Sequence, residues 1–244
     1  MKGYKRVAAY VDLDAIEDNF EAMKANLKEK TRIAAVVKAN GYGHGAAPIA
    51  RMIEKKDYLW GFAAATIEDA AELRRNGIQK PILILGYVFP EDYEELVRLD
   101  IRPTVFRLDM AKELSAEAVR QQKEVSVHIK VDTGMSRIGF ADTKESVQDV
   151  CAISKLPGIR MEGLFTHFAK SDELDKAATE KQLARYCAFR EACEAAGVKF
   201  QIHHCSNSAG IIDLPEANLD MVRAGITVYG LYPSDEVKKE LVPL

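Results

Sequence analysis

The feature that most constrains the fold of this chain is a regular alternation of strand-like and helix-like segments along its whole length. Short runs rich in valine, isoleucine and other apolar residues predict buried strands, and a helix-like stretch follows each of them. Eight or nine such units within 244 residues predict an α/β fold, a (β/α)8 barrel. The predicted strands span residues 7–13, 33–37, 60–65, 81–85, 102–106, 125–131, 159–165 and 200–205, with further strand-like segments at 221–222 and 227–231.

The helices between these strands are predicted from their end signals. Asp14 stands where an N-cap belongs before a helix over 15–30, and Asn76-Gly77 is a good helix end. The other predicted helices lie at 46–55, 66–75, 91–99, 109–121, 143–154, 176–196 and 209–214. A doubly wound open sheet is the competing fold, but no Gly-x-Gly-x-x-Gly motif follows the first predicted strand, which disfavours a dinucleotide-binding version.

The composition is that of an ordinary globular domain, with 48% hydrophobic and 29% charged residues. A net charge of −3 gives no electrostatic reason to expect nucleic acid or a membrane surface as a partner. No apolar run approaches the length of a membrane span, and the first residues lack the core of a signal peptide. The four cysteines form no CxxC pair, so we expect reduced thiols in a cytoplasmic protein.

A lysine at the end of the predicted strand 33–37 is the first candidate for chemistry. Lys38 opens the sequence Lys-Ala-Asn-Gly-Tyr-Gly-His-Gly, in which three glycines allow a sharp turn and a close approach of the backbone to a ligand. A lysine amine held at the mouth of a sheet can form a Schiff base with a carbonyl. The simpler alternative is a lysine that extends into solvent beside a glycine-rich turn.

The predicted strand 125–131 places further polar groups near the same end of the barrel. Its valines and isoleucine alternate with Ser126, His128 and Lys130, so the apolar set should contact the outer helices and the polar set should point inward. The strand leads into the sequence Asp-Thr-Gly-Met-Ser-Arg, which places Arg137 beyond its carboxyl end, where barrel active sites lie. Alone, Arg137 would be interpreted as a solvated loop residue.

Later strand ends add a histidine and a candidate anion site. His167 lies just after the end of strand 159–165. The sequence Cys-Ser-Asn-Ser-Ala-Gly at the end of strand 200–205 offers hydroxyls and backbone N–H groups at a helix start. The same sequence would serve equally well as a helix cap. His203 and His204 are neighbours on a strand and face opposite sides, so we assign no metal site. Together, these strand ends favour a phosphate-bearing ligand with a reactive carbonyl: pyridoxal phosphate on Lys38, or an aldolase-type substrate.

Several of these motifs resemble those of bacterial alanine racemases, in the same order. The stretch 37–45 is similar to the attachment motif for pyridoxal phosphate, and the stretch 130–139 is similar to a second specific motif of the family. Thr166-His167, the Ser-Asn-Ser sequence at 206–208 and the Arg-Ala-Gly-Ile sequence at 223–226 also match. The resemblance extends over nearly the whole chain and implies a pyridoxal-phosphate-dependent isomerase that supplies D-alanine for peptidoglycan.

The resemblance also implies a role for individual residues. Lys38 would hold the cofactor covalently and act as the base on the D-alanine side. The phosphate group would be held by Tyr42, Ser208, Gly225 and Ile226, with Asn207 beside it.

A second set of residues would contact the rest of the cofactor and the substrate. Arg223, supported by His167, would face the pyridine nitrogen, and because an arginine stays protonated it would leave that nitrogen unprotonated. This arrangement suits racemisation better than transamination. Arg137 would contact the cofactor's phenolic oxygen and the carboxylate of the substrate. Lys130 matches a position that is carbamylated in some members, where the negative charge orients the arginine.

The resemblance further implies a domain organisation. Residues 1–233 would form the cofactor-binding barrel, and residues 234–244 would begin a linker to a mostly β C-terminal domain that this chain does not contain. In the family that domain supplies a tyrosine, the base on the L-alanine side, across a head-to-tail homodimer. We therefore expect weak or absent racemase activity from this chain alone.

Two alternative functions stay open at this point. The first is a single-domain carrier of pyridoxal phosphate in cofactor homeostasis, which fits the chain length better but fits the Arg137 and Tyr42 motifs worse. The second is a racemase for another small amino acid such as serine.

Overall fold

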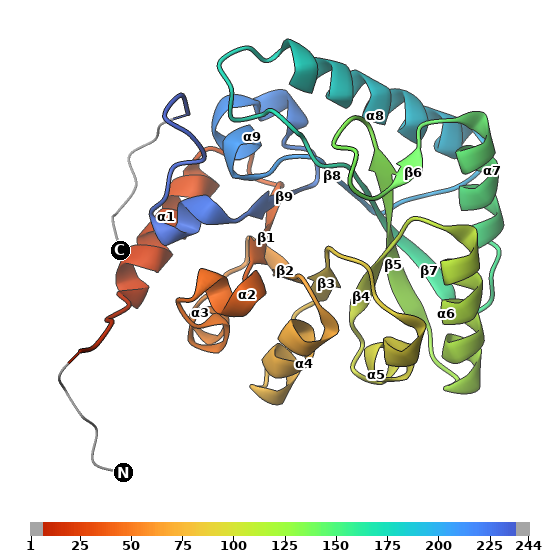
Figure 1. The fold of residues 1–244 in the computed structure, drawn as a ribbon, viewed down its shortest axis with the longest axis horizontal. Helices are drawn as coiled ribbons and strands as arrows, with labels where there is room; N and C mark the ends of the chain where they lie inside the picture. The colour runs from red at the N-terminus through yellow and green to blue at the C-terminus, as the bar shows by residue number, and fades with distance from the viewer. Residues whose placement is uncertain (1–6, 238–244) are drawn as a thin grey trace.

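Residues 7–237 are described by the computed structural model of the protein, in which eight parallel strands form a nearly closed barrel inside a ring of helices (Figure 1). This confirms the (β/α)8 prediction. Each strand pairs with its neighbours in the order β8-β7-β5-β4-β3-β2-β1-β9. The barrel strands are β1 (Arg32–Val36), β2 (Leu59–Ala64), β3 (Ile82–Ile84), β4 (Arg102–Val105), β5 (Val125–Asp132), β7 (Ile159–Phe165), β8 (Ile202–His204) and β9 (Met221–Ala224).

Two backbone hydrogen bonds join the ends of this strand order. The Asp220 amide donates to the His203 carbonyl at 3.1 Å, and the Arg223 amide donates to the Ser206 carbonyl at 3.0 Å, so β8 and β9 lie side by side. A short ninth strand, β6 (Phe140–Ala141), pairs with the end of β5 and folds the loop after it back onto the barrel.

Most of the helices lie on the outside of the barrel (Figure 1). Their bounds are α1 (Leu13–Ala25), α2 (Lys38–Tyr42), α3 (Ala46–Ile53), α4 (Ile67–Arg75), α5 (Tyr93–Arg98), α6 (Leu108–Arg120), α7 (Lys144–Ile153), α8 (Ala177–Ala195) and α9 (Ser208–Asp213), and three short 3-10 helices are η1 (Pro90–Asp92), η2 (Pro215–Ala217) and η3 (Ile226–Tyr229). The helix predicted over 66–75 is confirmed as α4, and Thr66 is its N-cap, since its side chain accepts a hydrogen bond from the Asp69 amide. Among residues 7–237, no helix is both long enough and apolar enough to cross a membrane.

Strand β5 shows how sequence alternation builds the two faces of the barrel wall. Val125, Val127, Ile129 and Val131 pack into the hydrophobic cluster between the strands and the outer helices, as predicted. The alternate side chains of His128 and Lys130 are buried inside the barrel. The strand therefore supplies a polar group to the interior at every second position.

A small apolar layer fills another part of the barrel interior. Four strands contribute one side chain each to this layer: Ala34, Trp60, Leu83 and Met221. Beside it, β2 approaches the residue that precedes β3 so closely that a Cβ on Gly61 would lie 2.2 Å from the Pro81 carbonyl oxygen. Glycine is therefore required at position 61 to let the strands pack at this distance.

The prediction for the N-terminal region is wrong. Residues 7–12 form no strand, and Val7 and Tyr10 are 87% and 92% exposed. The physical reason is that β1 already pairs with β2 on one side and β9 on the other, so this part of the barrel has no free edge. The first helix also begins earlier and ends earlier than predicted: its cap is Asp12, which accepts hydrogen bonds from the next amides, and the helix ends at Ala25.

The strand-like segment 227–231 is also predicted wrongly. The chain forms η3 there, and the Asn19 side-chain amide donates to the Val228 carbonyl at 3.4 Å, which ties η3 to α1. Beyond η3, the Ser234 hydroxyl donates to the Asp172 carbonyl, so the first part of the predicted linker contacts the loop after β7. The remainder of that linker, residues 238–244, lies outside the described residues.

Candidate active site

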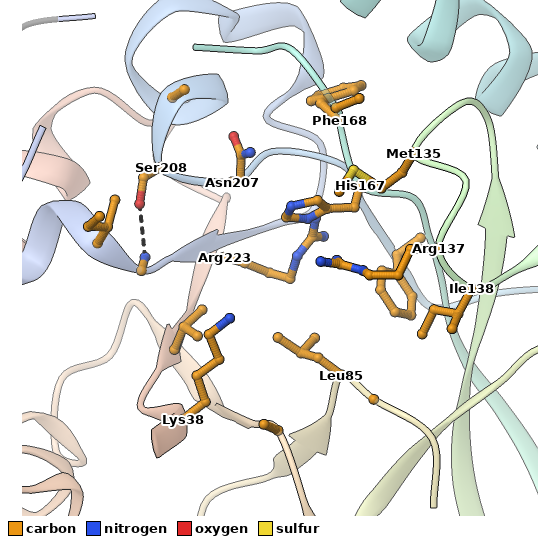
Figure 2. Close-up of a pocket in the computed structure, with 18 of the residues that line it drawn as sticks. Lys38, Leu85, Met135, Arg137, Ile138, His167, Phe168, Asn207, Ser208 and Arg223 are labelled. Carbon is orange, nitrogen blue, oxygen red and sulfur yellow. Dashed lines mark hydrogen bonds between the residues drawn. The ribbon is translucent and has the colours of Figure 1, made fainter. Parts of the chain in front are cut away.

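The ten residues singled out from the sequence all line one pocket, which has a volume of about 520 Å³. It lies at the carboxyl ends of the barrel strands, where α/β barrels carry their functional loops. Figure 2 shows Lys38, Arg137, His167 and Arg223 extending from different elements toward the same space. The predicted residues that it brings together are Lys38, Tyr42, Lys130, Arg137, His167, Asn207, Ser208, Arg223, Gly225 and Ile226.

A left-handed turn sets the position of Lys38. Directly after the lysine, Ala39, Asn40 and Gly41 have φ between 51° and 62°, and Tyr42 continues with φ of 52°. This conformation costs roughly 1–2 kcal/mol for each residue other than glycine. Compensation comes in part from the Asn40 side chain, whose Oδ1 accepts a hydrogen bond from the Ala46 amide at 2.9 Å.

The turn brings the Tyr42 ring beside Lys38 and into the pocket. Lys38 Nζ lies 5.6 Å from the centre of the Tyr42 ring, a distance that allows a cation–π contact. Tyr42 also packs on Tyr229, with ring centres 4.9 Å apart. The glycine-rich sequence therefore forms a compact turn that positions both side chains, which confirms the sharp turn expected from its glycines.

Two hydroxyl groups flank an open space at Gly225. A Cβ placed on this glycine would lie 3.3 Å from the Tyr42 hydroxyl oxygen and 3.7 Å from Ser208 Oγ. Ser208 Oγ accepts a hydrogen bond from the Gly225 amide at 3.1 Å, the dashed line in Figure 2. It accepts another from the Thr227 hydroxyl at 3.0 Å. Because its lone pairs are occupied, the Ser208 hydroxyl proton is directed to an acceptor elsewhere. The space is therefore suited to an oxyanion.

Asn207 acts as a helix cap, which is the alternative role that we considered for the Ser-Asn-Ser sequence. Its side-chain oxygen accepts a hydrogen bond from the Gly210 amide at 3.1 Å and another from the Ser171 hydroxyl at 2.9 Å. Asn207 also lines the pocket. Capping and lining are thus combined in one residue, with the amide oxygen facing the helix.

Arg223 lies at the centre of the pocket floor and is only 3% exposed. Its Nη2 donates to the carbonyl oxygens of Thr166 and Cys205, both at 2.8 Å, and contacts His167 Nδ1 at 3.3 Å. Its Nη1 donates to His204 Nδ1 at 2.8 Å and to the His204 carbonyl at 3.2 Å. Within residues 7–237, Nε is the guanidinium nitrogen that keeps a donor for a ligand.

Burial and the neighbouring cations set the protonation of His167. Arginine can only donate hydrogen bonds, so the contact of Arg223 Nη2 with Nδ1 of His167 favours the tautomer with its proton on Nε2. Burial, followed by the nearby cations Arg223 and Arg137, lowers the pKa of His167 to about 3. The imidazole is therefore neutral at physiological pH.

The loop that carries Arg137 is organised by the carboxylate of Asp132. One of its oxygens accepts the backbone N–H groups of Gly134, Met135 and Ser136 at 2.9–3.1 Å. Burial opposes ionisation of this carboxyl, but the backbone hydrogen bonds and Lys130 outweigh it, so its pKa is lowered. The stable anion keeps the loop tightly turned and holds Arg137 at the pocket (Figure 2).

Lys130 occupies the pocket wall below that loop and is 3% exposed. Its Nζ donates to the carbonyl oxygens of Val131 at 2.9 Å and Ile138 at 3.3 Å. Burial lowers the pKa of Lys130 to about 8, and nearby Arg223 and Arg137 act in the same direction. A minority of this amine, far larger than for an exposed lysine, is therefore unprotonated near neutral pH.

The residues that line the pocket carry four positive groups, on Lys38, Lys130, Arg137 and Arg223, and one carboxylate, on Asp172. Such an excess of cations in a half-enclosed space attracts anions. Sequence reasoning missed several other lining residues, among them Leu85, Tyr87 and Phe168. The signal available for them is their place directly after β3 and β7, at the same barrel end as Lys38.

The described residues contain no group of three or more histidine, cysteine, aspartate or glutamate side chains placed to hold a metal ion. His203 and His204 face opposite sides, as predicted: His203 Nδ1 lies 2.9 Å from an Asp220 oxygen, while His204 contacts Arg223 inside the barrel.

Comparison with known proteins gives a consistent result. A family model described as "Alanine racemase, N-terminal domain" matches residues 11–233. Alanine racemases from Desulforamulus reducens and Clostridium perfringens are 43% and 47% identical to the chain, over 95% and 98% of its length. The chain spans 62% and 61% of these two relatives, about three fifths of their length.

Solved structures of similar proteins have the same fold. A structure described as alanine racemase from Clostridium difficile 630 in complex with cycloserine superimposes with a TM-score of 0.93 and 44% identity. This likeness covers 95% of the present chain and 64% of that one.

Proposed function

Because the chain belongs to the alanine racemase N-terminal domain family, we propose that it forms the pyridoxal-phosphate-binding barrel of an enzyme that interconverts L-alanine and D-alanine. The observation that carries this proposal is the convergence of Lys38, a hydroxyl-lined anion site and Arg223 on one pocket. The barrel would extend to residue 233, with the linker after it.

The donor set fits pyridoxal phosphate. Its phosphate group would occupy the space at Gly225, with donors from the hydroxyls of Tyr42 and Ser208 and with Ile226 and Asn207 beside it. Lys38 lies within the same pocket, beside Tyr42, and would hold the cofactor covalently through Nζ. When bound, the cofactor would draw electrons from the α-carbon of the substrate and so acidify its α-proton.

Arg223 would set the protonation of the cofactor ring. Its Nη1 and Nη2 groups are bound to protein acceptors, which leaves Nε–H as a permanent donor, and a ring nitrogen facing it would accept a hydrogen bond and carry no proton of its own. His167 supports this orientation from the side as a neutral acceptor. An unprotonated ring holds charge less well, which favours returning the proton to the α-carbon.

Lys38 and Arg137 would act on the substrate. Lys38 Nζ would accept or return the α-proton on the D-alanine side, and Arg137 would bind the substrate carboxylate and the phenolic oxygen of the cofactor. A carbamate on Lys130 would give Arg137 an anionic partner, since Lys130 and Arg137 line the same pocket.

The opposite face of the α-carbon needs a second base, which we propose comes from outside residues 7–237, in a homodimer of the full-length family type. We therefore expect the 244-residue chain alone to have weak or no racemase activity.

Reduction with borohydride tests the cofactor assignment. Purified protein is mixed with pyridoxal phosphate, its absorbance is recorded, and mass spectrometry locates the reduced adduct. We expect the adduct on Lys38, loss of the absorbance band in Lys38→Ala, and no change in the control Lys112→Ala, which alters an exposed lysine on α6. An adduct on other lysines with Lys38 unlabelled would refute the proposal.

Exchange of the α-proton separates a racemase from a cofactor carrier. A barrel with racemase chemistry should exchange the α-proton of D-alanine with deuterated water through Lys38, even where net racemisation is slow. Binding of pyridoxal phosphate without exchange from either enantiomer would favour the carrier, and faster exchange from serine than from alanine would favour a racemase of different specificity.

A further inference from the structure

The charge of Arg223 is buried without a carboxylate in contact with it. The acceptors around its guanidinium are three backbone carbonyls and two imidazole nitrogens, and none of them within residues 7–237 is an acid. Burial lowers the pKa of Arg223 to about 10, so the group is charged at neutral pH in an environment that opposes the charge. A buried cation of this kind requires compensation.

A chain of hydrogen bonds leads from Arg223 through the barrel interior to an acid at the opposite end. His204 Nδ1 contacts Arg223, and its other ring nitrogen, Nε2, lies 2.9 Å from His128 Nδ1. His128 Nε2 then lies 3.1 Å from Glu162 Oε2. Both histidines are fully buried, and Glu162 is 5% exposed.

The two ends of this chain determine the position of every proton in it. Arg223 can only donate, so His204 Nδ1 accepts and the His204 proton lies on Nε2. That proton is donated to His128 Nδ1, so the His128 proton lies on Nε2 and is donated to Glu162. An ionised carboxylate can only accept, which makes the direction self-consistent.

The charge states of these groups agree with that order. Burial lowers the pKa of His128 and of His204, so both rings are neutral. Burial opposes ionisation of Glu162, but His128, Arg102 and Arg160 outweigh it, and its pKa is lowered. Arg102 and Arg160 lie 3.4 Å and 3.2 Å from the carboxylate oxygens.

Packing against neighbouring residues fixes the positions of the His128 and His204 rings. His204 stacks on Phe165 with an interplanar angle of 7° and ring centres 4.6 Å apart, and Trp60 contacts His128 edge-on. Strand β7 has a glycine where it passes His128: a Cβ on Gly163 would lie 2.2 Å from His128 Nδ1. The His128 ring therefore occupies the place of a side chain on the neighbouring strand.

We propose that Glu162 and His128 act through His204 as positioning residues for Arg223. The carboxylate orders both imidazole tautomers, and the lone pair thus presented by His204 Nδ1 keeps the guanidinium aimed at the cofactor. The effect on the cofactor rests on the proposed function, whereas the positions of the protons depend only on residues of the barrel and can be measured without cofactor. We call the hydrogen-bonded chain from Glu162 through His128 and His204 to Arg223 the relay. If the direction of donation in the relay were reversed, an N–H of His204 would face an N–H of Arg223.

Nitrogen NMR on the cofactor-free chain tests the proton order. Long-range proton–nitrogen spectra distinguish the two neutral imidazole tautomers from each other and from the charged ring. We expect His128 and His204 to be neutral at pH 7 with the proton on Nε2. A charged ring, or a proton on Nδ1 of either residue, would overturn the proposal.

A matched pair of variants tests the role of the carboxylate. Glu162→Gln keeps the shape but adds an N–H that can reverse the relay, while Glu124→Gln removes an exposed carboxylate that also contacts Arg160. We expect mixed tautomers at His128 and an affinity for pyridoxal phosphate at least about tenfold weaker in Glu162→Gln, the effect of losing a charge-assisted hydrogen bond. Glu124→Gln should match the native chain in both measurements.

A second variant displaces the ring without changing any charge. Gly163→Ala should push His128 away from His204 and disturb the His204 signals in a chain whose circular dichroism is native. If Glu162→Gln and Gly163→Ala keep native tautomers and native affinity, the relay is refuted while cofactor binding stands. If the native chain binds no pyridoxal phosphate, the proposed function fails, and the tautomer spectra still decide the relay.

Discussion

Exposure to dissolved carbon dioxide should convert Lys130 to a carbamate, in a reaction that joins the neutral amine to carbon dioxide and releases one proton. An ordinary lysine with a pKa of 10.5 has about 0.1% of its amine neutral at pH 7.4. With a pKa of about 8, Lys130 has about 20% neutral amine, roughly 200 times more. The structure therefore favours modification at this lysine over the exposed ones.

The surroundings of Lys130 favour the product as well as the reaction. Conversion replaces a positive charge by a negative one in a pocket that contains Arg137 and Arg223. The amine gives up one of its two hydrogen bonds to backbone carbonyls, while the remaining N–H keeps the other. Coulomb attraction to two arginines outweighs the loss of one hydrogen bond in a site of this kind.

Carbon NMR with labelled carbon dioxide measures the modification. At fixed dissolved carbon dioxide the carbamate signal should increase as the pH rises through about 8, because the neutral amine becomes more abundant. Lys130→Met should remove the signal. The matched control is Lys80→Met, because burial also lowers the pKa of Lys80 and this lysine likewise donates to two backbone carbonyls, those of Lys56 and Leu59, but it does not line the pocket that contains Arg137 and Arg223.

The opposite result would refute this reasoning. A carbamate signal of equal size in the native chain and in Lys130→Met would show that burial does not select Lys130. A signal that disappears in Lys80→Met would place the modification at the other end of the barrel and remove the basis for the Arg137 proposal.

Three further predictions follow from single contacts. Ser208→Ala removes the acceptor of a buried amide and a buried hydroxyl, so urea denaturation should show a loss of about 2 kcal/mol in the free energy of unfolding with an unchanged m-value; a change below about 0.5 kcal/mol would contradict it. Because the pKa of His167 is about 3 when folded and near 6.5 when unfolded, the unfolded chain binds more protons between these values. The free energy of unfolding should therefore fall as the pH drops from about 6.5 toward 3, and NMR should find the ring neutral at about pH 5; a ring that titrates near pH 6.5 would contradict this. Gly61→Ala places a Cβ against the Pro81 carbonyl and should lower stability by about 3 kcal/mol or abolish soluble expression, whereas native-like melting would show that the strands can separate.

The local pattern of the sequence was sufficient to predict most barrel strands. Strand β7 begins and ends at the predicted residues, and β5 differs by one residue, because apolar alternation is itself the cause of their burial. The segment 7–13 has the same local pattern but no sheet edge to join. Strand formation depends on a partner, and the partner lies far away in the sequence.

The candidate site also contains one part that the sequence predicts and another that it does not. Lys38, Arg137 and His167 follow predicted strands, and parallel strands bring their carboxyl ends together, so their meeting could be predicted. The interior relay could not, because it depends on the depth at which each ring sits. His204 was considered in the sequence only as a possible metal ligand, whereas its contacts with Arg223 and His128 join residues from three strands.

The glycine at position 163 links the evolution of β7 to that of β5, which carries His128. Any change that enlarges residue 163 fills the volume of the His128 ring, and any change that shrinks residue 128 leaves a cavity that a larger residue 163 could occupy. Among related sequences, these two positions should therefore change as a pair, and a lineage that loses the histidine becomes free to gain a side chain on β7. A contact between two chemically unlike residues thereby becomes a constraint on which sequences this barrel can reach by single steps.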